Sequence, residues 1–249
     1  MKIAVVGGTG MLGRRVSAEL RRRGHEVRVL SRRSLEHPVN LVTGEGLNAA
    51  LEGCDTLVDA SNASANAKNV LIDGTKKLLA ASKQAGISHH LCVSIVGCER
   101  IPMGYFGFKA EQELIVERSD VPWTIVRATQ FHDYIAVMFE QASRWKVLPL
   151  LKIPIQTVAV DEVAHTIADT VEATPRHGRL EVAGPEISDA RAVARTWRSV
   201  SGHRVIGLPI PLPGLLGREL RSGAATAEQP QVRGQITFES WLTEGKRHG

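Results

Sequence analysis

A glycine-rich stretch near the N-terminus, VVGGTGMLGRR from Val5 to Arg15, constrains the fold of this chain more than any other feature. It follows a short apolar run, KIAVV, that is typical of a buried strand. It opens a segment in which Leu12, Val16 and Leu20 recur at helical spacing. The stretch therefore predicts a strand, a tight turn and a helix in direct succession, which is the beginning of a βαβ unit.

The glycines of this turn satisfy two spacings found in phosphate-binding loops. Gly8, Gly10 and Gly13 fit GxGxxG, and Gly7, Gly10 and Gly13 fit GxxGxxG. At such a turn, backbone N–H groups and the positive end of the helix dipole face a pyrophosphate, and glycine lets the phosphates approach the main chain. We therefore interpret the turn as a nucleotide-binding loop and not as a purely structural corner. The predicted contacts are Gly7, Thr9, Gly10, Met11, Leu12 and Gly13.

Strands and helices alternate up to residue 128. Apolar runs predict further strands at 25–30, 55–60, 89–97 and 123–128, and helical periodicity predicts helices at 46–53, 69–86 and 104–119. This order predicts an α/β protein with a doubly wound parallel sheet, a Rossmann fold.

The pattern loosens towards the C-terminus. We expect helices at 131–144, 161–173, 189–200 and near 237–245, strands at 156–160 and 179–183, and proline-rich links at 147–155 and 208–217. Residues 1–130 are predicted to form the cofactor-binding core. Residues 131–249 are predicted to form a small substrate-binding lobe, interleaved with the sheet edge in a single structural unit.

Charge and cysteine content narrow the classes of partner. The formal net charge is +5, but the basic residues are spread along the chain, so we predict no nucleic-acid partner. Three cysteines without a CxxC pair, no leader-like segment and no apolar run of about 18 residues favour a soluble, cytoplasmic protein. We expect a small-molecule substrate, no membrane partner and no metal. A monomer and a homodimer are both left open.

The end of the predicted second strand, VLSRRS, favours NADP(H) over NAD(H). A site that prefers NAD usually places Asp or Glu about 20 residues after the glycines, where it accepts from the ribose 2′-hydroxyl. Here Ser31, Arg32 and Arg33 supply a hydroxyl and two guanidinium groups instead. These groups suit a 2′-phosphate through charge-assisted hydrogen bonds.

A candidate catalytic pair lies in the segment GYFGFKAEQE. Tyr105 and Lys109 have YxxxK spacing, which puts a phenol and an ammonium one turn apart on one face of a helix. A nearby cation lowers the pKa of a phenol, so Tyr105 is a candidate proton donor to a carbonyl undergoing reduction. Ser94 stands at the carboxyl end of the predicted fourth strand, where ligands of such sheets bind.

In these segments the chain resembles the short-chain dehydrogenase/reductase superfamily, specifically its atypical, NmrA-like and epimerase-like members. The resemblance covers nearly the whole chain. It rests on GGTGMLGRRV, GHEVRVLSRR, NVLIDGTKKLLAAS, VSIVG, YFGFK, VPWTIVRATQF and VDEVAHTIADTVE, which come in that family's order.

The resemblance implies roles for these residues. Ser94 would position the substrate carbonyl, Tyr105 would be the general acid, and Lys109 would hold the nicotinamide ribose. The residues implied to lie along the cofactor are Ala60, Ser61 and Thr129, and those implied to border the substrate pocket are Gln130, Phe131 and His132. For His132, a position on the surface of the following helix is the alternative.

Two features depart from the family's pattern. The loop HPVNLVTGEGL lacks the Asp of a "GD" step, which meets the adenine in many relatives. The interval from Ser94 to Tyr105 is not the usual one of reductases with an established Ser, Tyr and Lys triad.

Three functions follow as hypotheses. The first is an NADPH-dependent oxidoreductase that transfers hydride to or from a carbonyl or quinone-like small molecule. The second is a non-catalytic NADP(H)-binding sensor or regulator, although such a protein has no need of the Tyr105 and Lys109 pair. The third is a nucleotide-sugar epimerase, although the segment LPIPLPGLLG is more apolar than a diphosphate-binding lobe usually is.

Overall fold

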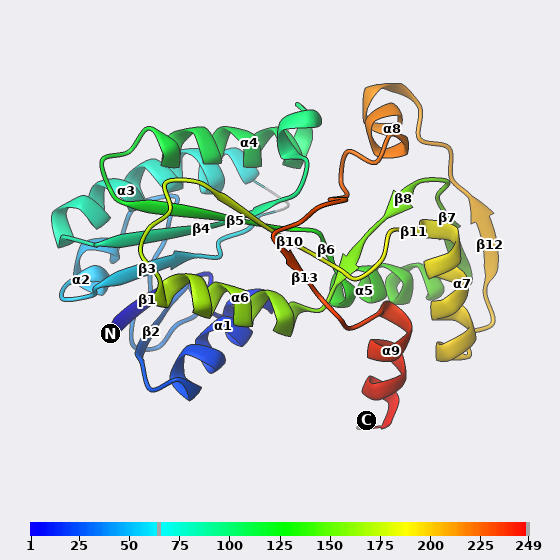
Figure 1. Ribbon diagram of the computed structural model, residues 1–249, viewed down its shortest axis with the longest axis horizontal. Coiled ribbons are helices and arrows are strands. Elements are labelled where there is room, and N and C mark those ends of the chain that lie inside the picture. The colour runs from blue at the N-terminus through cyan, green and yellow to red at the C-terminus, as the bar shows by residue number, and fades with distance from the viewer. Residues whose placement is uncertain (64–65, 248–249) are drawn as a thin grey trace. The chain divides into compact units, whose positions relative to one another are not determined.

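The computed structural model describes residues 1–63 and 66–247 and contains a seven-stranded parallel sheet (Figure 1). The strands of this sheet are β1 (Lys2–Val6), β2 (Glu26–Leu30), β3 (Thr56–Asp59), β4 (His89–Ile95), β5 (Trp123–Ala128), β10 (Arg179–Ala183) and β13 (Val232–Arg233). Their order across the sheet is β13-β10-β5-β4-β3-β1-β2. The predicted doubly wound parallel sheet is therefore confirmed.

The strand order reverses at β1, because β2 pairs with one of its edges and β3 with the other. In sheets of this kind, ligands bind beyond the carboxyl ends of the strands at the point of reversal. The glycine-rich turn follows β1 directly, so the topology places it at that point.

The chain divides into two compact units that interleave along the sequence. Unit 1 comprises Met1–Ser94, Pro102–Arg127 and Val163–Leu180, and unit 2 comprises Ile95–Ile101, Ala128–Glu162 and Glu181–Gly249. The predicted roles of residues 1–130 in cofactor binding and of residues 131–249 in substrate binding stay predictions.

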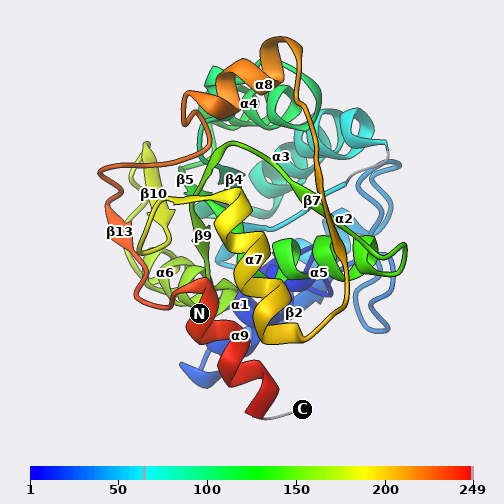
Figure 2. The same cartoon turned by 90° about the vertical axis from the view of Figure 1, so that its right-hand side faces the viewer.

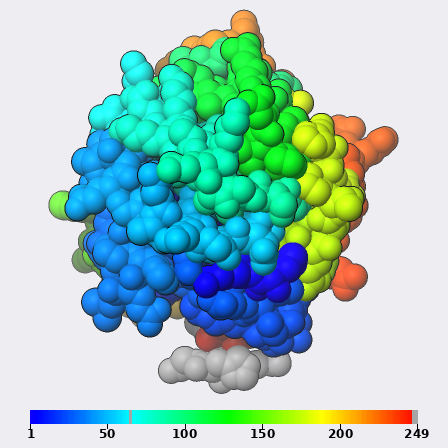
Figure 3. Space-filling model, turned by 90° about the vertical axis from the view of Figure 1, so that its left-hand side faces the viewer, coloured from blue at the N-terminus to red at the C-terminus, as the bar shows by residue number. Residues whose placement is uncertain are grey.

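In unit 1, helices cover both faces of the strands (Figure 1). Its helices are α1 (Met11–Arg22), α2 (Leu47–Leu51), α3 (Gly74–Ala85), α4 (Gly104–Glu117) and, from Val163 onward, α6 (Val160–Glu172). Because both faces are covered, most strand residues of this unit are buried, and Ile3, Leu57 and Leu91 are fully buried. Figure 3 shows the N-terminal segment of this unit, in blue, beside later segments coloured cyan to green.

Helix α3 differs from the prediction at its beginning. The predicted helix at 69–86 starts with a π-helical turn, η1 (Asn69–Asp73), and continues as α3 from Gly74. Leu71 and Ile72 are buried in this turn. Apolar spacing alone does not distinguish a π turn from the first turn of an α-helix, so the sequence pattern predicts one continuous helix.

Unit 2 is built from helices and short two-stranded ladders (Figure 2). Its helices are η2 (Cys98–Arg100), α5 (His132–Ser143), α7 (Ala190–Ser201), α8 (Gly214–Arg221) and α9 (Phe238–Arg247). The ladders pair β6 (Gln130–Phe131) with β9 (Thr157–Val158), β8 (Pro154–Ile155) with β11 (Ser188–Asp189), and β7 (Val147–Leu150) with β12 (Ile206–Pro209). Phe139, Leu148 and Trp197 are at the centre of its apolar core.

The two proline-rich links were predicted wrongly. Residues 147–155 contain β7 and β8, and residues 206–221 contain β12 and α8. Pro149 and Pro209 fit in β7 and β12 because each strand of a two-stranded ladder has an edge at which no N–H donor is needed. The expected strand at 156–160 is also shorter and covers only β9.

Within residues 1–63 and 66–247, no helix has both the length and the apolar character needed to cross a bilayer.

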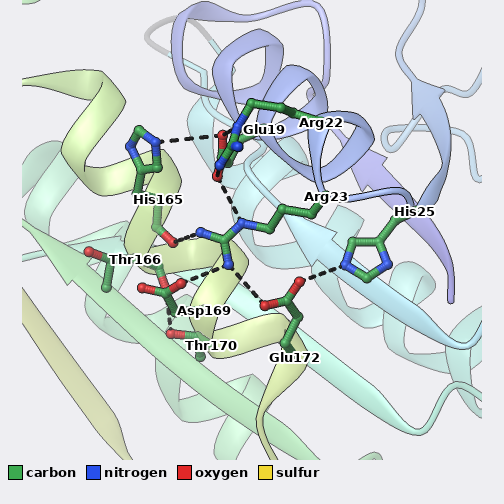
Figure 4. A network of polar contacts seen from close by, with 9 residues as sticks. All are labelled: Glu19, Arg22, Arg23, His25, His165, Thr166, Asp169, Thr170 and Glu172. Carbon is green, nitrogen blue, oxygen red and sulfur yellow. Dashed lines mark hydrogen bonds and ion pairs between the residues drawn. The ribbon is translucent and has the colours of Figure 1, made fainter.

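A network of ion pairs joins α1 to α6 within unit 1 (Figure 4). Arg23, directly after α1, points towards α6, and its Nη1 donates to Asp169 Oδ1 at 2.7 Å and to Glu172 Oε2 at 2.9 Å. The other oxygen of Glu172 is 2.8 Å from Nε2 of His25. The network therefore fixes the end of α1 against the last turns of α6.

Glu19 anchors the α1 side of this network. It accepts from Arg22 at 2.8 Å and from Arg23 at 2.8 Å, and these bonds lower the pKa of its carboxyl from 4.5 to about 2. A lowered folded-state pKa contributes stability that is fully present above pH 4.5 and is lost as the pH falls towards 2.

We therefore expect Glu19→Gln to lower the free energy of unfolding by about 1–2 kcal/mol near neutral pH, because charge-assisted bonds to two guanidinium groups are lost. Urea unfolding at several pH values would measure this. The difference from the unsubstituted protein should shrink as the pH falls from 4.5 towards 2. Glu36→Gln, at an exposed position, is the matched control. A difference that stays constant across this pH range would contradict the assignment.

Candidate functional site

The glycine-rich turn packs so closely that its glycines have no room for a side chain. Gly7 has a φ of +71°, and a Cβ there would lie 2.6 Å from the carbonyl oxygen of Ala60. A Cβ on Gly13 would lie 2.3 Å from the carbonyl oxygen of Gly7. Glycine at position 7 thus lets the bend after β3 approach the turn, and glycine at position 13 lets the first turn of α1 approach the end of β1.

The same turn leads directly into α1. Gly10 is the N-cap, so no side chain there can accept from the first N–H groups of the helix. By helix geometry, the N–H groups of Met11, Leu12 and Gly13 have no carbonyl one turn earlier in the same helix. Such groups, together with the helix dipole, form a site for a phosphate.

The end of β2 lies beside this turn. The N–H of Gly7 donates to the carbonyl of Leu30 at 2.9 Å, and Ser31 follows directly. The hydroxyl oxygen of Ser31 accepts from the N–H of Arg33 at 3.1 Å. Arg32 and Arg33 are both exposed, so their guanidinium groups are accessible beside the glycine turn.

The end of β3 approaches the turn from the other side of β1. The N–H of Ala60 donates to the carbonyl of Val6 at 3.0 Å. Asp59 is buried, and its Oδ1 accepts from the N–H of Ser61 at 2.9 Å, which fixes the bend after the strand. The structure thus brings Ala60 and Ser61 next to Gly7, while their contact with a cofactor stays a prediction.

Helix α4 contributes a buried ammonium group to this edge of unit 1. Lys109 is 3% exposed, and its Nζ donates to the carbonyl of Val93 at 2.9 Å and to Oε1 of Gln112 at 2.9 Å. A longer contact of 3.5 Å reaches the carbonyl of Ser61. Burial of an ammonium group is unfavourable unless it is hydrogen-bonded, and these acceptors offset that cost.

Tyr105 and Ser94 belong to the same unit. Tyr105 is half-buried in the first turn of α4, one turn before Lys109, and its ring contacts that of Phe106 edge-on at 6.2 Å between centroids. Ser94 is buried, one residue before the end of β4. Their catalytic roles stay predictions.

Thr129 and its two successors belong to unit 2. Thr129 is buried, its N–H donates to the carbonyl of Val182 at 3.0 Å, and its Oγ1 accepts from the N–H of Gly184 at 3.3 Å. Gln130 and Phe131 form β6 and are both partly buried. Contacts of these residues with a cofactor or substrate stay predictions.

His132, the first residue of α5, is fully buried. Its ring lies 5.6 Å from that of Phe238 and 5.7 Å from that of Trp241, and Nε2 is 3.0 Å from the carbonyl of Ile236. Burial lowers the pKa of His132, so the imidazole is neutral at ordinary pH. The surface position considered as an alternative is therefore wrong, while a substrate contact stays a prediction.

Two residues of this site, Gln112 and Asp59, were not predicted from the sequence. Gln112 is fully buried and joins Lys109 to Asp59, its Nε2 donating to Asp59 Oδ2 at 3.1 Å. The available signal was spacing, because Gln112 follows Lys109 by three positions and lies on the same face of α4.

Comparison with known proteins gives a match over most of the chain. A family model described as NAD(P)H-binding matches residues 7–174, which include the glycine turn and the candidate catalytic residues. A ceramide reductase from Caulobacter vibrioides is 27% identical over 93% of this chain and 81% of its own length. The photosystem II assembly factor Ycf39 of Trieres chinensis is 28% identical over 53% of this chain, and the match spans 46% of that protein.

Solved structures show the same fold. An NADPH-dependent quinone oxidoreductase from Escherichia coli, solved in complex with NADPH, superposes with a TM-score of 0.81. The superposition covers 98% of this chain and 99% of that protein, with 17% sequence identity. At this level of identity the likeness concerns the fold.

Proposed function

Since the chain belongs to the NAD(P)H-binding family, we propose that it is an NADPH-dependent oxidoreductase acting on a carbonyl or quinone-like small molecule. The observation that supports this most strongly is the buried ammonium of Lys109, one helical turn after Tyr105 and in contact with the strand ends beside the glycine turn. A lysine side chain is almost never this fully buried unless its ammonium group is paired. Two of the similar proteins carry the names of a reductase and a quinone oxidoreductase, which favours the same class.

The residues present fit a phosphorylated dinucleotide. The close-packed glycine turn and the N-terminus of α1, which has no side-chain cap, suit the pyrophosphate. Ser31, Arg32 and Arg33 suit the 2′-phosphate, because two exposed guanidinium groups supply charge-assisted hydrogen bonds. We therefore propose NADPH in preference to NADH.

In the proposed mechanism, the bound dinucleotide supplies or accepts a hydride. Ser94 orients the substrate carbonyl by a hydrogen bond from its hydroxyl group. In the direction of reduction, Tyr105 would donate its phenolic proton to the carbonyl oxygen and recover a proton from solvent afterwards. In the direction of oxidation, Tyr105 would take the proton of the substrate hydroxyl and release it to solvent. Lys109 holds the ribose and stabilises the phenolate that remains on Tyr105.

Fluorescence titration with NADPH and NADH, followed by assays of NADPH oxidation with carbonyl and quinone substrates, tests this proposal. We expect tighter binding of NADPH than of NADH. Tyr105→Phe should lower kcat by about 10²–10⁴-fold, because a positioned general acid contributes on that order. The affinity for NADPH should change little. Tyr134→Phe, the exposed second tyrosine of the chain, is the matched control.

Other outcomes would favour the alternatives. Tight NADPH binding without turnover of any substrate would favour a sensor. A cofactor that stays bound during purification, with interconversion of sugar nucleotides, would favour an epimerase. Preference for NADH would overturn the assignment of Arg32 and Arg33.

A further inference from the structure

We infer that Gln112 is a positioning residue for Lys109, and that Asp59 sets the orientation of the Gln112 side-chain amide. This inference rests on the proposed function, in which Lys109 acts on the cofactor and on Tyr105. It concerns a buried relay that joins the ends of β3 and β4 to α4 within unit 1.

Every polar atom of the Gln112 side chain is used in this relay. Oε1 accepts from Nζ of Lys109 at 2.9 Å, and Nε2 donates to Oδ2 of Asp59 at 3.1 Å and to Oγ1 of Thr75 at 3.0 Å. Gln112 is fully buried, and Asp59 and Thr75 are each 1% exposed. Since no water reaches these groups, loss of any one contact leaves its partner unsatisfied.

The orientation of the amide follows from the chemistry of its neighbours. An ionised carboxylate only accepts hydrogen bonds, so the NH₂ group of Gln112 must face Asp59. The carbonyl oxygen of the amide then faces Lys109, whose ammonium only donates. Asp59 therefore imposes, from the other end of the amide, the same orientation that Lys109 requires.

The hydrogen bonds of the relay also determine which N–H of Lys109 is left for a ligand. An ammonium group has three protons. Gln112 and the carbonyl of Val93 take two of them at 2.9 Å each. The third points to the carbonyl of Ser61 across 3.5 Å, the longest of the three contacts, at the bend beside the glycine turn. This is the proton that a nicotinamide ribose would accept.

A double-mutant cycle tests whether Gln112 acts through Lys109. Gln112→Met keeps the side-chain length but removes the acceptor, and we expect it to lower kcat by roughly tenfold to a hundredfold, as misplacement of a catalytic group does. In a Lys109→Met background the same substitution should have almost no further effect on kcat or on NADPH affinity. Gln84→Met, exposed on α3, is the control. Effects that simply add would show that Gln112 has a merely structural role, and would overturn the inference.

A charge exchange tests the role of Asp59. Gln112→Glu alone places two carboxylates in contact, so we expect at least the loss of activity seen with Gln112→Met, together with a lower melting temperature. Adding Asp59→Asn restores a donor opposite the new carboxylate, which can still accept from Lys109, and should recover most of the activity. A double variant no better than Gln112→Glu would overturn the inference.

Failure of the proposed function would look different. If the unsubstituted protein reduced no substrate, the proposed function would fail. The double-mutant cycle and the charge exchange would then be evaluated by measuring the dissociation constant of NADPH for each variant. Non-additive effects and recovery by the double exchange in that constant would still support the relay. If the unsubstituted protein turns over substrate but the effects add, the relay fails and the proposed function stands.

Discussion

Replacing Gly13 by alanine is expected to lower the affinity for NADPH by roughly fivefold to a hundredfold. The new Cβ would lie 2.3 Å from the carbonyl oxygen of Gly7 and 2.7 Å from Cα of Gly8. Both are backbone atoms, so the glycine turn or the first turn of α1 has to move. Overpacking of this kind costs about 1–3 kcal/mol, and roughly 2.7 kcal/mol corresponds to a hundredfold in a dissociation constant.

Fluorescence titration of NADPH against the variant measures this loss. Gly245→Ala is the matched control, because a Cβ at that position in α9 meets no atom within 4 Å. Circular dichroism would show whether the variant keeps its secondary structure. Unchanged NADPH affinity in a folded Gly13→Ala protein would mean that the cofactor does not use this turn.

Replacing Arg127 by methionine is expected to lower the free energy of unfolding by about 3–5 kcal/mol, because it leaves a buried carboxylate without its main partner. Arg127 on β5 bonds both oxygens of Glu113, Nε to Oε1 at 2.9 Å and Nη2 to Oε2 at 2.6 Å. Glu113 is 1% exposed and accepts in addition from the more exposed Arg179 at 3.1 Å. The pair fixes α4, which carries Tyr105 and Lys109, to β5.

The double variant Arg127→Met with Glu113→Met is the informative control. Replacing both members of a buried ion pair by apolar side chains is often nearly neutral, because no unpaired charge remains. Urea unfolding of the single and double variants should therefore show the double variant to be clearly more stable than Arg127→Met. A double variant less stable than either single variant would contradict this account of the pair.

The sheet and the first helices could be predicted from the sequence because each strand of unit 1 is a short apolar run bounded by turn residues. Gly24 and Gly86, both with positive φ, end α1 and α3 where the sequence indicates. In unit 2, β7 and β12 were missed for a different reason. Pro149 and Pro209 are tolerated only because β7 and β12 form an isolated two-stranded ladder, and that pairing is not visible in either segment alone.

The candidate site was predicted only in part. The glycine turn was predicted from the spacing of its glycines between a strand and a helix. The structure places this turn at the point where the strand order reverses. Gln112 and Asp59 were missed because their contact joins positions 53 residues apart in the sequence. A buried glutamine on a helix has the same local pattern as an exposed one, so only the packing of α4 against β3 and α3 distinguishes them.

Because the two units interleave along the sequence, no single stretch of the gene encodes all of unit 1 and nothing else. The chain leaves unit 1 after Arg127 and returns to it with Val163–Leu180, which carry most of α6 and Arg179. A contiguous gene fragment ending near residue 130 would lack Asp169 and Glu172, two of the carboxylates that hold Arg23, and Arg179, one of the cations that hold Glu113. The residues of unit 1 therefore cannot be moved to another protein as one uninterrupted stretch of sequence.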